Sequence, residues 1–177
     1  KYLNLKLQNQ LLLEENKNLK KILFNSETTT KSFDSKNSIG FEVMTASVIK
    51  NSYSKTNNFI TINKGSKHGI GIDNGVISSN GVVGIIDKTT TNYSRLISIL
   101  NTNFLLNAKF KNSNYFGVLS WNGKNINKVQ LKDVPKQAKI KIGDTIVTGG
   151  NSLIFPKGIL IGYIQSFKLD NSENYLE

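Results

Sequence analysis

The residues whose spacing most resembles a reactive site form a glycine-rich stretch, "GSKHGIGIDNGVISSNGVVGII", from Gly65 to Ile86, which holds six glycines in 22 residues. Loops that bind phosphate bring successive backbone amides together at the start of a helix. Here no Gly-Lys-Ser/Thr follows the glycines, and "VISS" after "GIDNG" has the pattern of a strand. "DNG" at 73–75 and "NG" at 80–81 are hairpin-type turn sequences, because Gly and Asn tolerate positive φ. The stretch therefore predicts β-turns and no phosphate site.

The single histidine, His68, is the residue that would have to serve as the base of a serine-histidine-aspartate triad. It lies in the polar turn sequence "SKHG", and no Gly-x-Ser-x-Gly nucleophile elbow is present. Ser52–Lys55 matches the Ser-x-x-Lys motif of penicillin-interacting enzymes, but its Ser-Asp-Asn and Lys-Thr-Gly companions are missing. In a chain with 22 lysines such a match is expected by chance. We therefore predict an exposed turn histidine and no catalytic residue.

Residue types that bind metals and cofactors are equally sparse. The sequence has no cysteine, which excludes disulfides, thiolate catalysis and cysteine-based zinc or iron–sulfur sites. The 12 acidic residues are scattered, and the only adjacent pair, Glu14-Glu15, falls in a helical stretch. Because a metal site needs several clustered ligands, the sequence predicts no metal and no cofactor.

The formal net charge of +11 raises the question of a nucleic acid partner. Of the 23 basic residues, 22 are lysine and Arg95 is the only arginine. Lysine lacks the planar fork with which arginine reads guanine or holds phosphate. The joint excess of lysine and asparagine is typical of codon bias, and no dense basic run exceeds Lys20-Lys21. We therefore predict no nucleic acid partner.

Residues 1–25 have the composition of a helix and the repeat of a coiled coil. The stretch lacks Gly and Pro, and two seams with a seven-residue period predict a heptad with leucine at d. Asparagine at a positions favours two parallel helices in one register. The predicted dimerisation residues are Tyr2, Leu5, Asn9, Leu12, Asn16, Leu19 and Leu23. The alternative is a single amphipathic helix that packs on its own domain.

The rest of the chain has the pattern of a connection followed by β-strands. Residues 26–42 are rich in Ser, Thr, Asn and Lys and predict a flexible linker. From residue 43, short apolar or alternating runs recur at the spacing typical of a β-barrel or sandwich. The passages "GIDNGVISSN…GVVGII" and "KIGDTIVTGGN…FPKGILIGYI" look alike, a weak internal duplication. It predicts two small β-domains, 43–101 and 102–177, with the C-terminal end packed back on the first.

Most of the glycines are predicted to shape turns. Gly84 instead interrupts an apolar strand, which is typical of a barrel bend or a close approach of two backbones. Trp121 follows the strand "FGVLS", and we expect its ring to close one end of a barrel rather than to anchor a partner. The predicted structural residues are Gly65, Gly69, Gly75, Gly81, Gly84, Gly143, Asp144, Gly149, Pro156, Gly158 and Gly162.

In the order of its motifs the chain resembles the rod shape-determining protein MreC family, in the part outside the cytoplasmic membrane. The resemblance covers essentially the whole chain and rests on "ENKNL", "ITINKGSKHGI", "GVISSNGVVGII", "FGVLSWNG", "IKIGDTIVTGG" and "FPKGILIG". It implies barrels like those of chymotrypsin-type proteases, without a catalytic triad. The expected fold class is mainly β, with an N-terminal coiled-coil helix followed by two small β-barrel domains. The chain ends at "NSENYLE", where the family typically continues into further strands.

The resemblance also implies a function and a set of partners. Family members are non-catalytic scaffolds of the bacterial elongation (rod) complex that bind and activate the elongation-specific penicillin-binding transpeptidase, which controls peptidoglycan synthesis and cell shape. The resemblance implies homodimers, with filaments as a further form of assembly, and it implies MreD and, indirectly, MreB as partners. One upstream helix anchors them at the periplasmic face of the cytoplasmic membrane. No run here reaches the roughly 18 apolar residues of a spanning helix, so we expect that anchor before Lys1.

Two other function classes stay open from the sequence. A trypsin-like β-barrel hydrolase, or its inactive pseudo-hydrolase form, would need His68 beside an acid and a hydroxyl. A coiled-coil-tethered ligand-binding module would need no such constellation. The sequence assigns no partner-binding residues, although barrel edges and loops are the surfaces that such domains offer.

Overall fold

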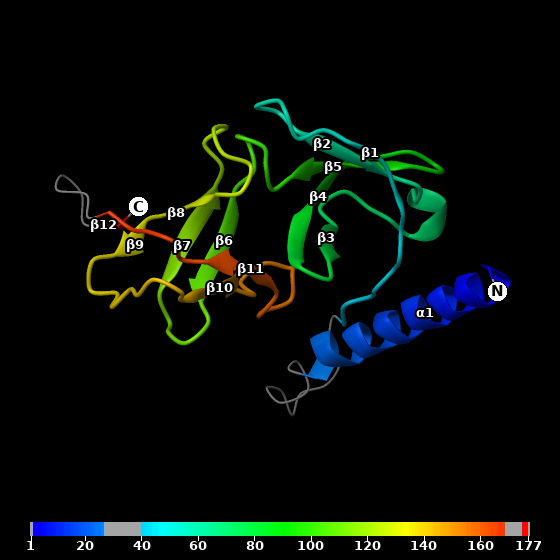
Figure 1. Cartoon of the computed structure of the whole chain (residues 1–177), viewed down its shortest axis with the longest axis horizontal. Coiled ribbons are helices and arrows are strands. Elements are labelled where there is room, and N and C mark those ends of the chain that lie inside the picture. The colour runs from blue at the N-terminus through cyan, green and yellow to red at the C-terminus, as the bar shows by residue number, and fades with distance from the viewer. Residues whose placement is uncertain (1, 27–39, 169–174, 177) are drawn as a thin grey trace. The chain divides into compact units, whose positions relative to one another are not determined.

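In the computed structural model the described residues are 2–26, 40–168 and 175–176 (Figure 1). The chain divides into two compact units, Lys1–Ala46 and Ser47–Glu177. Most of the predicted linker 26–42 lies outside the described residues, as does the segment 169–174 of the predicted second β-domain. The helix belongs to the first unit and the strands belong to the second.

The first unit contains α1 (Tyr2–Ser26), which covers the predicted helical stretch. Leu, Lys, Glu and Gln lose little side-chain freedom in a helix, and no Gly or Pro interrupts the run. The last carbonyl groups of a helix have no backbone N–H to bond. Two side chains supply donors here: Asn25 Nδ2 donates to Lys21 O and Ser26 Oγ donates to Leu23 O, both at 2.8 Å. No described helix is long and apolar enough to cross a membrane.

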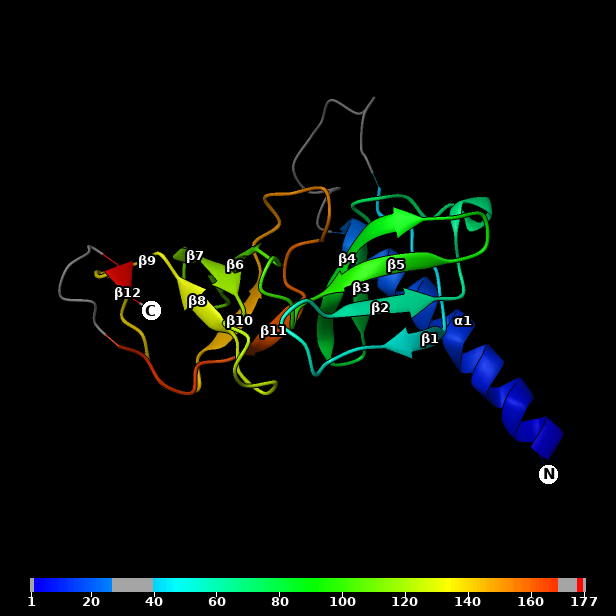
Figure 2. The same cartoon turned by 90° about the horizontal axis from the view of Figure 1, so that it is seen from above.

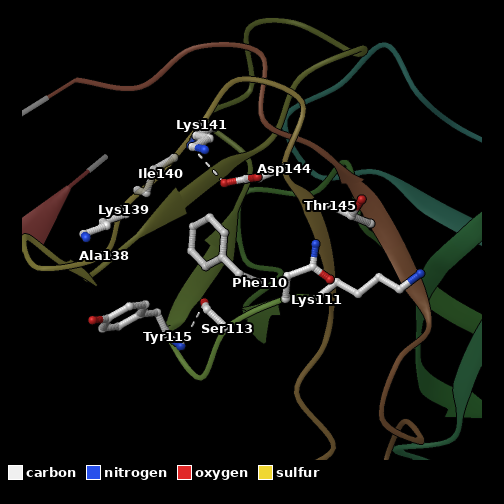
Figure 3. A pocket seen from close by; sticks show the side chains of 11 residues that line it. Phe110, Lys111, Ser113, Tyr115, Ala138, Lys139, Ile140, Lys141, Asp144 and Thr145 are labelled. Carbon is white, nitrogen blue, oxygen red and sulfur yellow. Dashed lines mark hydrogen bonds between the residues drawn. The ribbon is translucent and has the colours of Figure 1, made fainter.

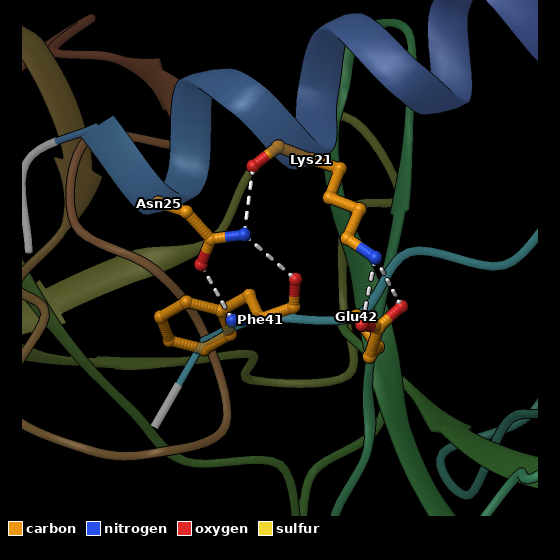
Figure 4. A network of polar contacts seen from close by, with 4 residues as sticks. All are labelled: Lys21, Asn25, Phe41 and Glu42. Atoms are coloured by element: carbon orange, nitrogen blue, oxygen red, sulfur yellow. Dashed lines mark hydrogen bonds and ion pairs between the residues drawn. The ribbon is translucent and has the colours of Figure 1, made fainter. Parts of the chain in front are cut away.

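The last turn of α1 is tied to residues 41–42 of the same unit (Figure 4). The Asn25 carboxamide pairs with the Phe41 backbone in both directions, since Oδ1 accepts from its N–H at 2.7 Å and Nδ2 donates to its carbonyl at 3.1 Å. Lys21 Nζ lies 2.8 Å from the Glu42 carboxylate. Exposed ion pairs contribute little, so Asn25 is the main tie between the helix and the chain that follows.

The second unit begins with a five-stranded antiparallel sheet in the order β1-β2-β5-β4-β3 (Figure 2). Its strands are β1 (Val48–Asn51), β2 (Phe59–Ile62), β3 (Gly75–Ser78), β4 (Gly81–Thr89) and β5 (Ser94–Ser98). Alternate side chains of β2 and β5 are buried, as expected for strands with one face on a core. That core consists of Ile60, Ile62, Ile86 and Leu96. The short 3-10 helix η1 (Ser66–His68) lies between β2 and β3.

A second five-stranded antiparallel sheet follows, in the order β11-β10-β6-β7-β8. Its strands are β6 (Leu106–Phe110), β7 (Phe116–Ser120), β8 (Gln130–Lys132), β10 (Thr145–Thr148) and β11 (Leu160–Tyr163). The two-residue strands β9 (Val134–Pro135) and β12 (Tyr175–Leu176) pair with each other. Its buried core is Phe104, Leu106, Ala108, Phe110, Leu119, Val134, Ala138, Ile146 and Phe155.

The two sheets pack directly on each other within the second unit. Partly buried side chains of the first sheet, including Ile77 and Ile97, contact the core of the second. Two glycines permit this approach, because a Cβ at Gly75 would lie 2.5 Å from the Phe155 ring and a Cβ at Gly81 would lie 2.2 Å from the Leu160 carbonyl oxygen. Side chains at either position would push the sheets apart.

The predicted fold class is confirmed: the chain is mainly β, with an N-terminal helix and two curled half-barrel sheets. The strand expected from residue 43 is regular only from Val48. Trp121 is buried after β7, and its Nε1 donates to Asn125 O at 2.8 Å, so its ring belongs to the barrel. The domain limits 43–101 and 102–177 stay a prediction, since both sheets fall in one compact unit.

Candidate partner-binding site

His68 is placed for a structural role at the glycine-rich turn. Its Nδ1 accepts a hydrogen bond from the Gly65 backbone N–H at 3.2 Å. Partial burial of the ring, and then the charges of Lys64 and Lys67, lower the pKa of His68 below its ordinary value of 6.5. A triad needs a carboxylate on Nδ1, and in the described part of the chain no ion pair involves this ring. The geometry around His68 is therefore that of a turn.

The lowered pKa gives a testable pH dependence. The unfolded chain binds a proton at His68 before the folded chain does, so the stabilising contribution is present above pH 6.5 and is lost as the pH falls through the folded pKa. We expect His68→Gln to reduce the fall in thermal midpoint between pH 7 and about pH 5, because it removes the titrating group. Thermal unfolding of both chains at the two pH values checks this. An equal or steeper fall in the variant would contradict it.

One pocket of about 290 Å³ lies between the β6–β7 turn and the loop before β10 (Figure 3). The buried ring of Phe110 forms its floor, and three lysines, Lys111, Lys139 and Lys141, belong to its exposed lining. The Asp144 carboxylate accepts from the Lys141 backbone N–H at 2.8 Å and so stabilises the turn. The Ser113 hydroxyl accepts from the Tyr115 N–H at 3.4 Å and faces no base. The pocket therefore offers no pair of nucleophile and base.

The single guanidinium is occupied within the first sheet. Arg95 of β5 forms a bidentate ion pair with Asp87 of β4, with Nε 3.1 Å from Oδ1, and its Cζ lies 4.2 Å from the centroid of the Phe59 ring. The hydrogen bonds to Asp87 raise the pKa of Arg95. Among the described residues no group of three or more His, Asp or Glu side chains could hold a metal ion.

The predicted dimerisation seam is exposed on α1. Leu12 and Leu23 are 53% and 63% exposed, and Asn16 Nδ2 donates to the Leu12 carbonyl of its own helix at 2.8 Å. Leu11 and Ile22, which lie off the seam, are exposed to the same degree. Exposure therefore leaves many apolar side chains available for a partner helix, and only the heptad period selects the seam. The side chain of Tyr2 lies outside the described set.

The predicted turn residues divide into three groups. Gly69, Gly81, Gly143 and Gly158 have positive φ, between 81° and 131°. Gly65, Gly75 and Gly84 sit where a Cβ would come within 2.6 Å of a neighbouring atom, and Gly149 lies against the Phe116 ring. Asp144 and Pro156 hold turns through hydrogen bonds to Lys141 N and Thr148 Oγ1. Gly162 belongs to none of these groups: it lies inside the apolar strand β11, and a Cβ there would meet nothing within 4 Å.

The described residues form a helix and two curled sheets and contain no group of side chains arranged for catalysis. Comparison with known proteins shows which family has this architecture. A family model described as "Rod shape-determining protein MreC, barrel core" matches residues 48–177. The chain belongs to the MreC family. A curated relative, the cell shape-determining protein MreC of Listeria monocytogenes, is 31% identical over 164 residues, which are 90% of this chain and 52% of the relative. The chain thus spans about half the length of that MreC.

Solved structures of MreC have the same fold. An MreC structure from Listeria monocytogenes has a TM-score of 0.75 and 25% identity, and the match covers 99% of this chain and 85% of that one. A second neighbour is MreC in a complex with Penicillin-Binding Protein (PBP2) from Helicobacter pylori, with a TM-score of 0.57 and 19% identity over 71% of this chain and 76% of that one. The PBP2 partner is that of the Helicobacter protein, and the similarity between that protein and this chain is one of fold.

The sequence does not predict the burial of one lysine of this MreC-family chain. Lys109 of β6 is only 8% exposed, whereas the lysine-rich composition by itself is typical of codon bias. The period of two along "LLNAKF" places Lys109 opposite the core-facing Ala108 and Phe110. That pattern gives the face of the strand, but the burial of the Lys109 side chain depends on neighbours in other strands.

Proposed function

We propose that this chain is a non-catalytic scaffold of the rod complex, which binds and activates the elongation-specific penicillin-binding transpeptidase. The observation that carries the proposal is the MreC family match over 48–177, together with a fold like that of an MreC solved in complex with PBP2. In this proposal the protein lies at the periplasmic face of the cytoplasmic membrane and is held there by an upstream membrane anchor. MreD is a further proposed partner, and MreB acts indirectly.

Dimerisation is part of the same proposal. Tyr2, Leu5, Asn9, Leu12, Asn16, Leu19 and Leu23 would form the seam between two parallel helices. The support is the heptad period and the exposure of the seam leucines. Two copies would present two pairs of β-sheets to the transpeptidase, which raises the effective concentration of a second contact once the first has formed. Lateral association through an edge strand such as β1, which is exposed at all four residues, would build filaments.

A binding titration tests the proposed function. This chain is titrated with the extracytoplasmic part of the elongation transpeptidase from the same organism, at near-physiological salt and again at higher salt. Saturable binding that survives the higher salt supports the scaffold. Binding that disappears with salt would show a nonspecific contact made by the +11 charge, and would contradict the proposal.

Asn16 should control the oligomeric state. We expect Asn16→Leu to convert a specific dimer into higher or mixed oligomers, because a buried asparagine at an a position selects two strands at some cost in stability. Asn18→Leu makes the same substitution outside the seam and should leave the mass unchanged. Sedimentation equilibrium of the three chains measures the difference. Equal masses for all three chains would show that Asn16 does not lie in the seam between two helices.

A further inference from the structure

His68 closes the short helix η1 with a hydrogen bond that only a neutral imidazole can make. Gly65 is the N-cap of η1, and the His68 Nδ1 accepts a hydrogen bond from the Gly65 backbone N–H at 3.2 Å. A neutral imidazole has one nitrogen that accepts, whereas both nitrogens of the protonated ring donate. Protonation at Nδ1 therefore removes this acceptor and places two N–H groups opposite each other.

The Gly65 N–H lies where a lost acceptor is hard to replace. Gly65 is buried, and a Cβ there would lie 2.1 Å from the Thr90 carbonyl oxygen and 2.6 Å from Tyr93 N. Its backbone is thus packed tightly against the turn between β4 and β5, residues 90–93. A buried N–H without a partner is unfavourable, so the chain that carries it must move before water can reach it.

The chain between β2 and β3 that carries this hydrogen bond is the η1 segment, residues 65–70. Ser66 N and Lys67 N donate to carbonyl groups of the β4–β5 turn at 2.9 and 3.3 Å. At the other end Ile70 N donates to Gly65 O at 3.3 Å, and the Ile70 side chain packs on the core of the first sheet. A surface segment with so few contacts can open while the strands beneath it stay paired.

The charges around the ring also favour its neutral form. Partial burial of the ring, and then the charges of Lys64 and Lys67, lower the pKa of His68, and a backbone hydrogen bond with Gly65 acts in the opposite direction with the smallest effect. The β4–β5 turn adds no charge near neutral pH, since its one titratable side chain is the phenol of Tyr93. The closed segment therefore binds a proton at His68 less readily than the open segment does.

We propose that the η1 segment is a pH-sensitive switch: when His68 takes up a proton, the segment leaves the β4–β5 turn and exposes Ile70, while the strands of the first sheet stay paired. The closed form is favoured above pH 6.5, and the open form gains as the pH falls below that value. This inference goes beyond the proposed function and holds whether or not a transpeptidase is the partner.

Amide hydrogen exchange of three chains, at pH 7 and at about pH 5, tests the switch. His68→Gln places an oxygen acceptor where a capping box carries Gln, and it does not titrate. His68→Leu removes the acceptor at both pH values. The protection factor, which is the intrinsic exchange rate at each pH divided by the measured rate, is compared for Ser66, Lys67 and Ile70, with Leu96 of β5 as the reference.

We expect the unaltered chain to lose protection in the η1 segment by about fivefold between pH 7 and about pH 5, relative to Leu96, because the open form binds the proton more tightly. His68→Gln should keep its protection within about twofold over the same range. His68→Leu should already show at pH 7 the low protection that the unaltered chain reaches at about pH 5, because both lack the acceptor.

Each other outcome would overturn the switch. Unchanged protection in the unaltered chain would show that protonation leaves the segment closed. An equal fall in His68→Gln would mean that another group titrates, and an equal fall at Leu96 would mean that the whole sheet opens. Full protection of His68→Leu at pH 7 would show that the hydrogen bond from Gly65 does not hold the segment. If His68→Leu does not fold, the comparison of the unaltered chain with His68→Gln decides alone.

Discussion

Gly84→Ala is expected to lower the free energy of unfolding by about 3 kcal/mol, whereas Gly162→Ala should change it by less than about 1 kcal/mol. Gly84 is buried in β4, and a Cβ there would lie 2.1 Å from the Ile97 carbonyl oxygen of β5. Neither strand can retreat without breaking the ladder between them. Gly162 lies in β11, where a Cβ would meet nothing within 4 Å. Alanine there only restricts the unfolded chain.

Urea denaturation followed by the fluorescence of Trp121, the only tryptophan, measures both variants. The pair is matched, because each glycine interrupts an apolar strand and each receives the same methyl group. A loss at Gly162 as large as that at Gly84 would contradict the packing described for the two sheets. If the slope of the free energy of unfolding against urea concentration is unchanged, the variants expose the same surface on unfolding as the unaltered chain.

The same two glycines show where the sequence stops predicting the structure. "GVVGII" and "GILIGYI" look alike, and the strand pattern around both predicted two β-strands correctly. The roles of the glycines differ because Gly84 faces a central neighbour, β5, while β11 is an edge of its sheet. Which strand lies beside a glycine depends on the order of strands in space, and a period of two carries no information about that order.

The sequence predicts some features of the candidate site and leaves others open. The lack of a catalytic constellation could be argued from residue types, since one histidine and no cysteine leave few combinations. The seam of α1 could be read from its period, but a single chain holds no second helix that would test it. Lys109 could be assigned to a face of β6 and to nothing more. The burial of its side chain depends on Phe116 and Val147, which belong to the neighbouring strands β7 and β10.

Asn58→Leu is expected to lower the free energy of unfolding by about 3 kcal/mol, although the two side chains are close in size. Asn58 is fully buried, and its Oδ1 accepts from Lys55 N and Ser52 Oγ at 3.0 and 3.1 Å. Its Nδ2 donates to the carbonyl groups of Lys55 and Leu100 at 2.7 and 2.6 Å. Leucine would remove the partners of the Lys55 N–H and of the Lys55 and Leu100 carbonyl groups, and each polar group left unpaired away from water costs about 1 to 3 kcal/mol.

Asn57→Leu is the matched control, since Asn57 is exposed and its side chain meets only other exposed polar groups, Thr102 and Asn103. We expect a change of less than about 1 kcal/mol there. Equal losses at both positions in urea denaturation would contradict this expectation, because they would show that the buried amide of Asn58 contributes no more than an exposed one.

Amide hydrogen exchange locates the weakened point. Asn58 joins the β1–β2 turn to Leu100, just before the second sheet begins, so its loss should also speed exchange at Ser98, whose N–H donates to the Asn58 carbonyl at 3.1 Å. Faster exchange there, with slow exchange kept at Leu96 in the core of the first sheet, would place the weakened point at the end of β5 beside the β1–β2 turn and not in the middle of the sheet.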